Sequence, residues 1–316
     1  MAASTVKLSG GTTTIRIAGS AAKALRSAGV TMSPSKPAQA TGAGILLPVS
    51  GGSIDPATAK GTISQKGGLV LKKGRTKLSL GNLVLNTSKG TLSAKSGKTS
   101  VAIASLSGGK VARRGFATTV SGVKVKLNKT GAGALNTSFA TRAFKAGLVL
   151  ATASSAPTSK QVAIARGTTS IHIDPTAART LIGAGASVGA IAPATLDTTT
   201  LTLSLPITGG VLNPDTLDGQ ITHGGGLSIG SFQLTSVALN LGSTKTLSTS
   251  LGTLADLQYS TMATNIDAAK RTIAIGDISI NLNSTAIAAL GAISPSLAAL
   301  PAGTPIGAAD VAAAAR

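Results

Sequence analysis

The chain repeats its own pattern once, and the repeat runs from one end to the other. Residues 11–17, GTTTIRI, return as residues 167–173, GTTSIHI. Residues 61–69, GTISQKGGL, return without a gap as residues 219–227, GQITHGGGL. Each half of a duplicated chain must form the same structure by itself, so this feature limits the fold more than any other.

The two copies are predicted to be separate domains. The change from one to the other falls within residues 151–160, where Ser, Thr and Pro give a polar stretch typical of a short linker. The predicted domains are therefore residues 1–155 and residues 156–316. Both have the size of an ordinary domain, roughly 100–200 residues.

Alternating aliphatic and polar residues predict strands in both copies. Hydrophobic residues make up 42% of the chain and aromatic residues only 2%, so Val, Ile, Leu and Ala must form the core. The pairs Gly10-Gly11, Gly67-Gly68 and Gly108-Gly109 predict turns between strands. The predicted fold class is mainly β, with two tandem antiparallel β-sandwich-like domains that each carry one or two short helices.

Helix signals follow the first long strand of each copy. In the second copy Asp174 is a good N-cap and Pro175 suits the first helical position. In the first copy Ser20 takes the place of the cap. A second short helix is predicted near the end of each copy, at residues 130–135 and 284–290.

The two copies differ most in charge. Residues 1–155 carry 22 Lys and Arg against Asp55 alone, whereas residues 156–316 carry 7 basic residues and 8 Asp. The formal net charge is therefore 22 − 1 = +21 for the first copy and 7 − 8 = −1 for the second. A field of one sign attracts polyanions by releasing their counterions. The alternative is that the charge only keeps a Thr- and Ala-rich surface soluble.

The candidate polyanion-binding residues lie in three basic stretches of the first copy. Alternation in residues 123–127 places two of them on one face of a strand. Candidate partners are anionic cell-wall polymer or another polyanion. Sequence-specific nucleic-acid binding is not expected, because almost no aromatic residue is present for stacking. The candidates are Lys72, Lys73, Arg75, Lys77, Arg113, Arg114, Lys124 and Lys126.

The sequence predicts no enzymatic activity, no catalytic residue and no metal site. Cysteine is absent, and the first copy has a single carboxylate and no His or Tyr. The second copy has His172, His223, Tyr259 and its Asp residues, but their spacing resembles neither metal ligation nor a carboxylate pair. His223 stands at the end of a predicted strand beside a glycine turn, where a His usually makes structural hydrogen bonds. The first copy has Gln65 at the same position.

Several segments together resemble the HtaA domain of actinobacterial cell-surface proteins. They are the PITGG of residues 206–210, the block of residues 219–227 and the closing PAGTPIG of residues 301–307. The resemblance covers nearly all of both copies. It implies a β-rich surface domain.

The resemblance also implies that some such domains bind haem, through a Tyr near the domain start and a His after a Gly-x-Val strand. His223 is similar in position to that His. The Tyr has no counterpart, because Leu25 and Leu181 occupy the helices that would carry it, and Tyr259 lies far along the chain. Haem- or small-ligand binding through His223 and Tyr259 is therefore the alternative function, and no cofactor is expected otherwise.

The preferred function is that of a structural or adhesive protein, secreted or associated with the cell wall, whose basic first domain binds anionic surface polymer. A further alternative is self-assembly into a surface fibre or layer through strand edges. No stretch has the roughly 18 apolar residues that a transmembrane helix needs. We expect that a signal peptide has been removed and that Met1 replaces it.

Overall fold

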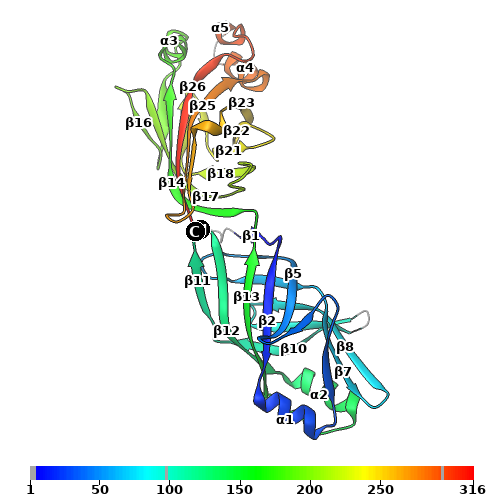
Figure 1. Ribbon diagram of the computed structural model, residues 1–316. Helices are drawn as coiled ribbons and strands as arrows, with labels where there is room; N and C mark the ends of the chain where they lie inside the picture. Colours follow the sequence, from blue (N-terminus) through cyan, green and yellow to red (C-terminus); the bar gives the residue numbers. More distant parts are fainter. Residues whose placement is uncertain (1–4, 97–98, 293–294) are drawn as a thin grey trace. The chain divides into compact units, whose positions relative to one another are not determined.

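The computed structural model describes residues 5–96, 99–292 and 295–316. It forms two compact units, Thr5–Lys160 and Gln161–Arg316 (Figure 1). The division falls a few residues after the predicted boundary at 155. Each unit holds one copy of the repeat. None of the helices in the described ranges is long and apolar enough to cross a membrane.

In the first unit, a single path of hydrogen-bonded strands closes on itself. It runs β5-β2-β13-β12-β10-β9-β8-β6 and returns to β5. β7 and β3 continue outward from β8. The elements are β1 (Val6–Lys7), β2 (Gly10–Ile17), α1 (Gly19–Ser27), β3 (Thr31–Ser35), β4 (Gln39–Thr41), β5 (Gly44–Ile54), β6 (Gly61–Gln65), β7 (Gly68–Lys73), β8 (Thr76–Asn86), β9 (Thr91–Ser96), β10 (Thr99–Ser107), β11 (Lys110–Arg114), β12 (Ala117–Leu127), α2 (Lys129–Phe139) and β13 (Val149–Thr158).

The second unit repeats the same closed path in the same chain order. It runs β17-β14-β26-β25-β23-β22-β21-β18 and returns to β17, while β15, β19 and β20 form a small separate sheet. The elements are β14 (Val162–Ile173), α3 (Pro175–Gly183), β15 (Val188–Ile191), β16 (Thr195–Asp197), β17 (Thr202–Leu212), β18 (Gly219–His223), β19 (Gly226–Ile229), β20 (Phe232–Leu234), β21 (Ala238–Leu241), β22 (Thr246–Thr249), β23 (Gly252–Gln258), η1 (Thr261–Ala263), β24 (Thr264–Asp267), β25 (Thr272–Leu282), α4 (Ser284–Gly291), α5 (Pro295–Ala298) and β26 (Pro305–Ala315).

The prediction of a mainly β, antiparallel fold with short helices is confirmed, and the structure adds the closure of each sheet. Strand alternation explains which side chains enter the core. In β12, Val123, Val125 and Leu127 are buried while Lys124 is exposed. Closure also pairs the first long strand of each copy with the last, with Thr13 opposite Ser155 and Thr169 opposite Val311.

The predicted helices are present, and their caps are partly as predicted. Asp174 caps α3 through Oδ1, which accepts hydrogen bonds from the backbone N–H groups of Thr176 (2.8 Å) and Ala177 (3.0 Å). The assignment of Ser20 as a cap is wrong. Ser20 lies inside α1, and its hydroxyl donates to the carbonyl oxygen of Val149 (2.9 Å). That bond fixes the helix to β13 instead of closing its N-terminus.

Two other local predictions are also wrong. Most of the predicted linker, residues 151–158, belongs to β13, because Ala151, Ala153 and Ser155 alternate inward and complete the closed sheet. Gly10 and Gly11 begin β2 and do not form a turn. At Gly11 the approach of the backbone at Ala156 leaves no space for a side chain, which explains the glycine.

One end of each closed sheet is covered by helices and by the strands outside the ring. In the first unit α1, α2 and the β7–β8 hairpin lie together at this end (Figure 1). The space between them is filled by a compact apolar cluster. It contains Leu135, Phe139 and Phe144, which are 7%, 2% and 3% exposed.

Candidate ligand-binding pocket

The corresponding end of the second unit contains a cavity of about 730 Å³. Residues of α3, α4 and α5 line it together with the small sheet β15-β19-β20 and the end of the closed sheet. Leu181 on α3, Leu227 on β19 and Leu290 on α4 are among the residues that face it. Its volume lies within the range of roughly 300–1,000 Å³ that small-molecule sites occupy.

The lining of the cavity is almost entirely aliphatic. Leu, Ile, Val and Ala side chains predominate, and Phe232 is the one aromatic residue among the described lining residues. The only lining residues with polar side chains in the described ranges are Asp174, Thr176, Thr180, Thr198, Thr249 and Thr304. No His, Cys, Met, Tyr, Lys or Arg belongs to that described lining. The described lining therefore supplies no His, Cys, Met or Tyr as an axial ligand for haem iron, and it does not fit haem.

The aromatic side chains that fill this end of the first unit have no counterpart in the second copy. In the first unit the amide of Asn136 binds the backbone of Phe144 twice, with Nδ2 donating to its carbonyl oxygen (2.7 Å) and Oδ1 accepting from its N–H (3.1 Å). This holds Phe144 beside Phe139. The matching segment, residues 283–304, contains no aromatic residue, and Gly291 stands where Asn136 does in the repeat.

Large apolar side chains at the edge of the cavity are exposed to solvent. Ile182 at the end of α3 is 62% exposed and Leu251 between β22 and β23 is 45% exposed, and both line the cavity. The repeat places Arg26 of the first copy at the position of Ile182. The edge formed by Ile182 and Leu251 is therefore an apolar mouth.

His223 lies inside the closed sheet and is not among the residues that line the cavity. It is 6% exposed, its Nε2 is 2.7 Å from Thr169 Oγ1, and its Nδ1 is 3.1 Å from the carbonyl oxygen of Val237. Since a carbonyl oxygen only accepts, Nδ1 carries the proton and Nε2 accepts from the Thr169 hydroxyl. Burial lowers the pKa of His223 from 6.5 to about 4, against the opposing effect of the bond to Val237. His223 thus joins two strands as a neutral group.

Tyr259 follows β23 and also lies outside the cavity lining. Its hydroxyl oxygen accepts a hydrogen bond from the N–H of Gly242 (2.6 Å), and Lys245 Nζ lies 5.2 Å from its ring centroid. The structure gives no hydrogen bond between Tyr259 and His223 among the residues it describes. Both residues have structural hydrogen bonds in this arrangement.

The eight candidate polyanion-binding residues lie in three places in the first unit. Lys72, Lys73, Arg75 and Lys77 form the tip of the β7–β8 hairpin at the helical end, and Lys73 Nζ donates to the carbonyl oxygen of Phe139 at the end of α2 (2.8 Å). Arg113 and Arg114 lie on β11, which pairs with the opposite end of β12. Lys124 and Lys126 are on β12, on the outer face of the sheet. The structure therefore does not bring all eight together.

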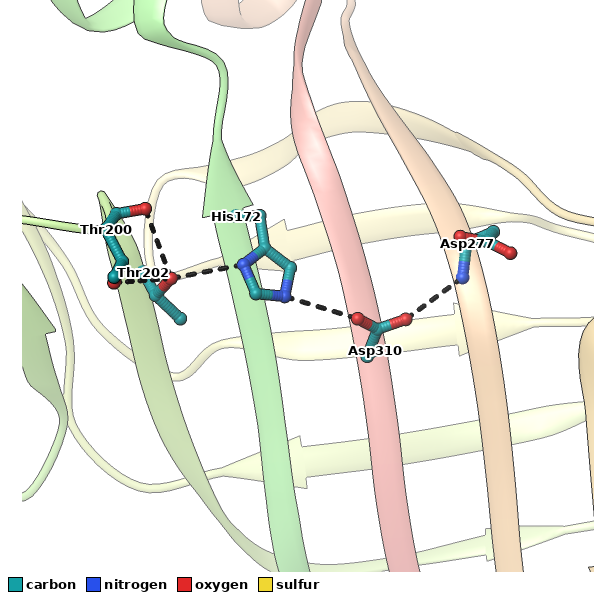
Figure 2. Close-up of polar contacts among 5 residues, drawn as sticks. All are labelled: His172, Thr200, Thr202, Asp277 and Asp310. Atoms are coloured by element: carbon teal, nitrogen blue, oxygen red, sulfur yellow. Dashed lines mark hydrogen bonds and ion pairs between the residues drawn. The ribbon is translucent and has the colours of Figure 1, made fainter.

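Sequence reasoning missed a polar chain on the outer face of the second unit (Figure 2). His172 Nδ1 is 3.1 Å from Thr202 Oγ1, and its Nε2 is 3.2 Å from Asp310 Oδ2. Asp310 Oδ1 accepts from the N–H of Asp277 (3.1 Å), where β25 has a bulge and Asp277 a φ of 54°.

Comparison with the first unit indicates that this row of polar side chains has a structural role. There the bulge of β12 is held by the Ser154 hydroxyl, which accepts from the N–H of Gly122 (3.4 Å). His172 and Asp310 are exposed on a strand face, and neither lines the cavity. In the described parts of the chain, no three His, Cys, Asp or Glu side chains gather in a way that could hold a metal ion.

A closed antiparallel β domain with a helix-covered apolar pocket is the class that this geometry defines. No protein-family model matches the sequence, and no curated protein matches it. Among solved structures, the chain is similar to the C-terminal domain of HtaA from Corynebacterium glutamicum, with a TM-score of 0.38 and 15% identity over 48% of this chain and 98% of that one. It is also similar to a domain-swapped dimer of a variant of the same domain, with a TM-score of 0.33 and 17% identity over 43% of this chain and 88% of that one. Both solved structures contain the domain that the sequence was found to resemble.

Proposed function

We propose that the protein binds a small apolar molecule in the pocket of the unit Gln161–Arg316. The observation that carries this proposal is a cavity of about 730 Å³ with an aliphatic lining and an apolar mouth. Apolar cavities of this size are costly to leave unfilled, because their lining atoms lose dispersion contacts. A ligand restores those contacts and removes apolar surface from water.

Filling the pocket should abolish binding. Ala289 on α4 lines the cavity, so Ala289→Phe places a ring inside it. We expect this variant to bind the neutral dye N-phenylnaphthylamine at least about tenfold more weakly than the unaltered protein. Dye fluorescence titration measures the affinity directly.

The chain offers a matched control one residue away. Ala288 is exposed on α4 and does not line the cavity, so Ala288→Phe adds the same ring to the surface. Its affinity for the dye should stay within about twofold of the original value. Equal losses in the two variants, or no dye binding by the unaltered protein, would contradict the proposal.

A second function is proposed for the unit Thr5–Lys160, namely binding of an anionic surface polymer. The specific observation is that basic side chains surround its helical end, while Asp55, the only acid of that copy, is buried. Exposed Lys and Arg flank the apolar cluster on α1, at the start of α2, on the β7–β8 hairpin and on both sides of Phe144. Besides the hairpin residues they are Lys23, Arg26, Lys129, Arg142 and Lys145.

Removing positive charge from the helical end should weaken polyanion binding more than removing the same charge elsewhere. The triple variant Lys72→Gln, Arg75→Gln, Lys77→Gln removes three cations from the hairpin tip. With long-chain inorganic polyphosphate as the probe, we expect weaker binding and a salt dependence whose log–log slope is reduced by about 0.7 for each phosphate group that is no longer neutralised. Isothermal titration at several salt concentrations measures both.

The control variant removes the same charge from the strands. Lys110→Gln, Lys124→Gln, Lys126→Gln should leave the affinity for polyphosphate nearly unchanged. If both triples weaken binding equally, the interaction follows net charge and has no particular place. The predictions of a secreted or wall-associated location, of a non-enzymatic role and of self-assembly stay predictions.

A further inference from the structure

The described lining of the pocket in the second unit contains almost no charged side chains. Asp174 is the only charged residue among the lining residues that the structure describes. Its Oδ1 already accepts the two N–H groups that begin α3. No Lys or Arg of the described lining could neutralise an anionic group of a ligand.

This arrangement disfavours fatty acids as ligands. A carboxylate moved from water into an aliphatic site loses its hydration, and it stays ionised only where a cation or several donors replace that water. Here it would meet no cation from the described lining and would lie near the negative charge of Asp174. Arg26, which the first copy has at the position of Ile182, is the kind of residue that is missing.

Hydroxyl groups are the polar partners that the pocket does offer. The Thr180 hydroxyl donates to the carbonyl oxygen of Thr176 (2.9 Å) inside α3. By contrast, the hydroxyls of Thr176 and Thr198 form no side-chain hydrogen bond with any residue that the structure describes, and both residues are exposed at the pocket. A Thr hydroxyl both donates and accepts, which suits an uncharged hydroxyl or ester group.

We infer that the ligand is an uncharged lipid with a hydroxyl or ester head group. Its hydrocarbon part lies among the Leu and Ile side chains of the cavity, and its head group binds at the edge through Thr176 and Thr198. This inference rests on the proposed function of the pocket and adds the chemical class of the ligand to it.

Competition between matched ligands tests the inference on the full chain. N-phenylnaphthylamine reports on the pocket, and dodecanol and dodecanoate are added at neutral pH to displace it. The two ligands share one hydrocarbon chain and differ in the charge of the head group. We expect dodecanol to bind at least about tenfold more tightly than dodecanoate.

Ile182→Arg restores the cation that the first copy has at this position. Because Ile182 is 62% exposed, the substitution leaves the fold intact. The variant should narrow the difference in affinity between dodecanol and dodecanoate, because the added cation attracts the carboxylate and not the uncharged hydroxyl group. As a control, Arg179→Gln removes an exposed cation of α3 that does not line the cavity, and it should change neither affinity.

Two failures are distinguishable. If dodecanol and dodecanoate displace the dye equally well, or if Arg179→Gln removes dodecanoate binding, the pocket accepts anionic head groups and the inference is overturned while the proposed function stands. If neither the dye nor either ligand binds, the proposed function is overturned and this inference with it.

Discussion

Replacing Phe139 with Ala should lower the free energy of unfolding of the first unit by about 3–5 kcal/mol. Phe139 is 2% exposed and packs in the cluster that fills the helical end of that unit. Removing its ring leaves a cavity that the surrounding side chains close only in part. Urea unfolding followed by hydrogen exchange of peptides from residues 5–160 measures the change without interference from the second unit.

The same variant should acquire a weak binding site for apolar molecules. An apolar cavity remains dry and takes up ligands such as benzene, so benzene should restore part of the lost stability. Phe116→Ala provides the control, because Phe116 is half-buried and lies outside the cluster. The prediction is contradicted if Phe139→Ala loses no more unfolding free energy than Phe116→Ala and benzene restores none of it. The cluster would then not stabilise the helical end.

Acidification should destabilise the second unit through His223. Its pKa is about 4 in the folded protein and 6.5 as an ordinary value, so the unfolded chain binds more protons between these two pH values. The contribution of His223 to the free energy of unfolding is therefore fully present above pH 6.5. It decreases as the pH is lowered through the window from 6.5 to 4, and it changes no further below pH 4. The total loss is about 3 kcal/mol.

Tyr259 makes this change measurable in the full chain. It is the only Tyr, the chain has no Trp, and it lies in the second unit, so its fluorescence reports the unfolding of that unit alone. His223→Gln, which introduces the residue of the first copy, should remove most of the pH dependence in the window. His172→Gln alters an exposed His and should retain it. A pH dependence that survives His223→Gln would assign it to the carboxylates instead.

Local signals in the sequence predicted much of the fold. The duplication, the alternation in β12 and the cap at Asp174 depend on neighbouring residues, and each is present in the structure. The predictions failed where distant partners decide the outcome. Residues 151–158 look like a linker, but they pair with β2 and β12, which lie far away in sequence. Ser20 looks like a cap, but the carbonyl of Val149 takes its hydroxyl.

The pocket could not be predicted from the sequence for a similar reason. His223 and Tyr259 are conspicuous as rare polar residues, whereas the cavity is lined by common aliphatic residues and lies where the second copy has no aromatic counterpart of Phe139 and Phe144. The signal available was the lack of any aromatic residue in residues 283–304, where the first copy has Phe139 and Phe144. Its meaning depends on knowing that both Phe side chains fill one space. Only the structure shows this, because the shared space is formed where α2 packs with residues next to α1 and on β7.

The pairing of the first long strand of each copy with the last determines when each copy can finish folding. The hydroxyls of Thr13 and Ser155 lie 2.9 Å apart although 142 positions separate them in the chain. Contacts between such distant residues form slowly, because the loop between them must be ordered first. During synthesis, neither copy reaches its final form until its last strand has left the ribosome. A nascent chain that ends before β13 or β26 therefore remains open, with two unpaired strand edges accessible to chaperones and proteases.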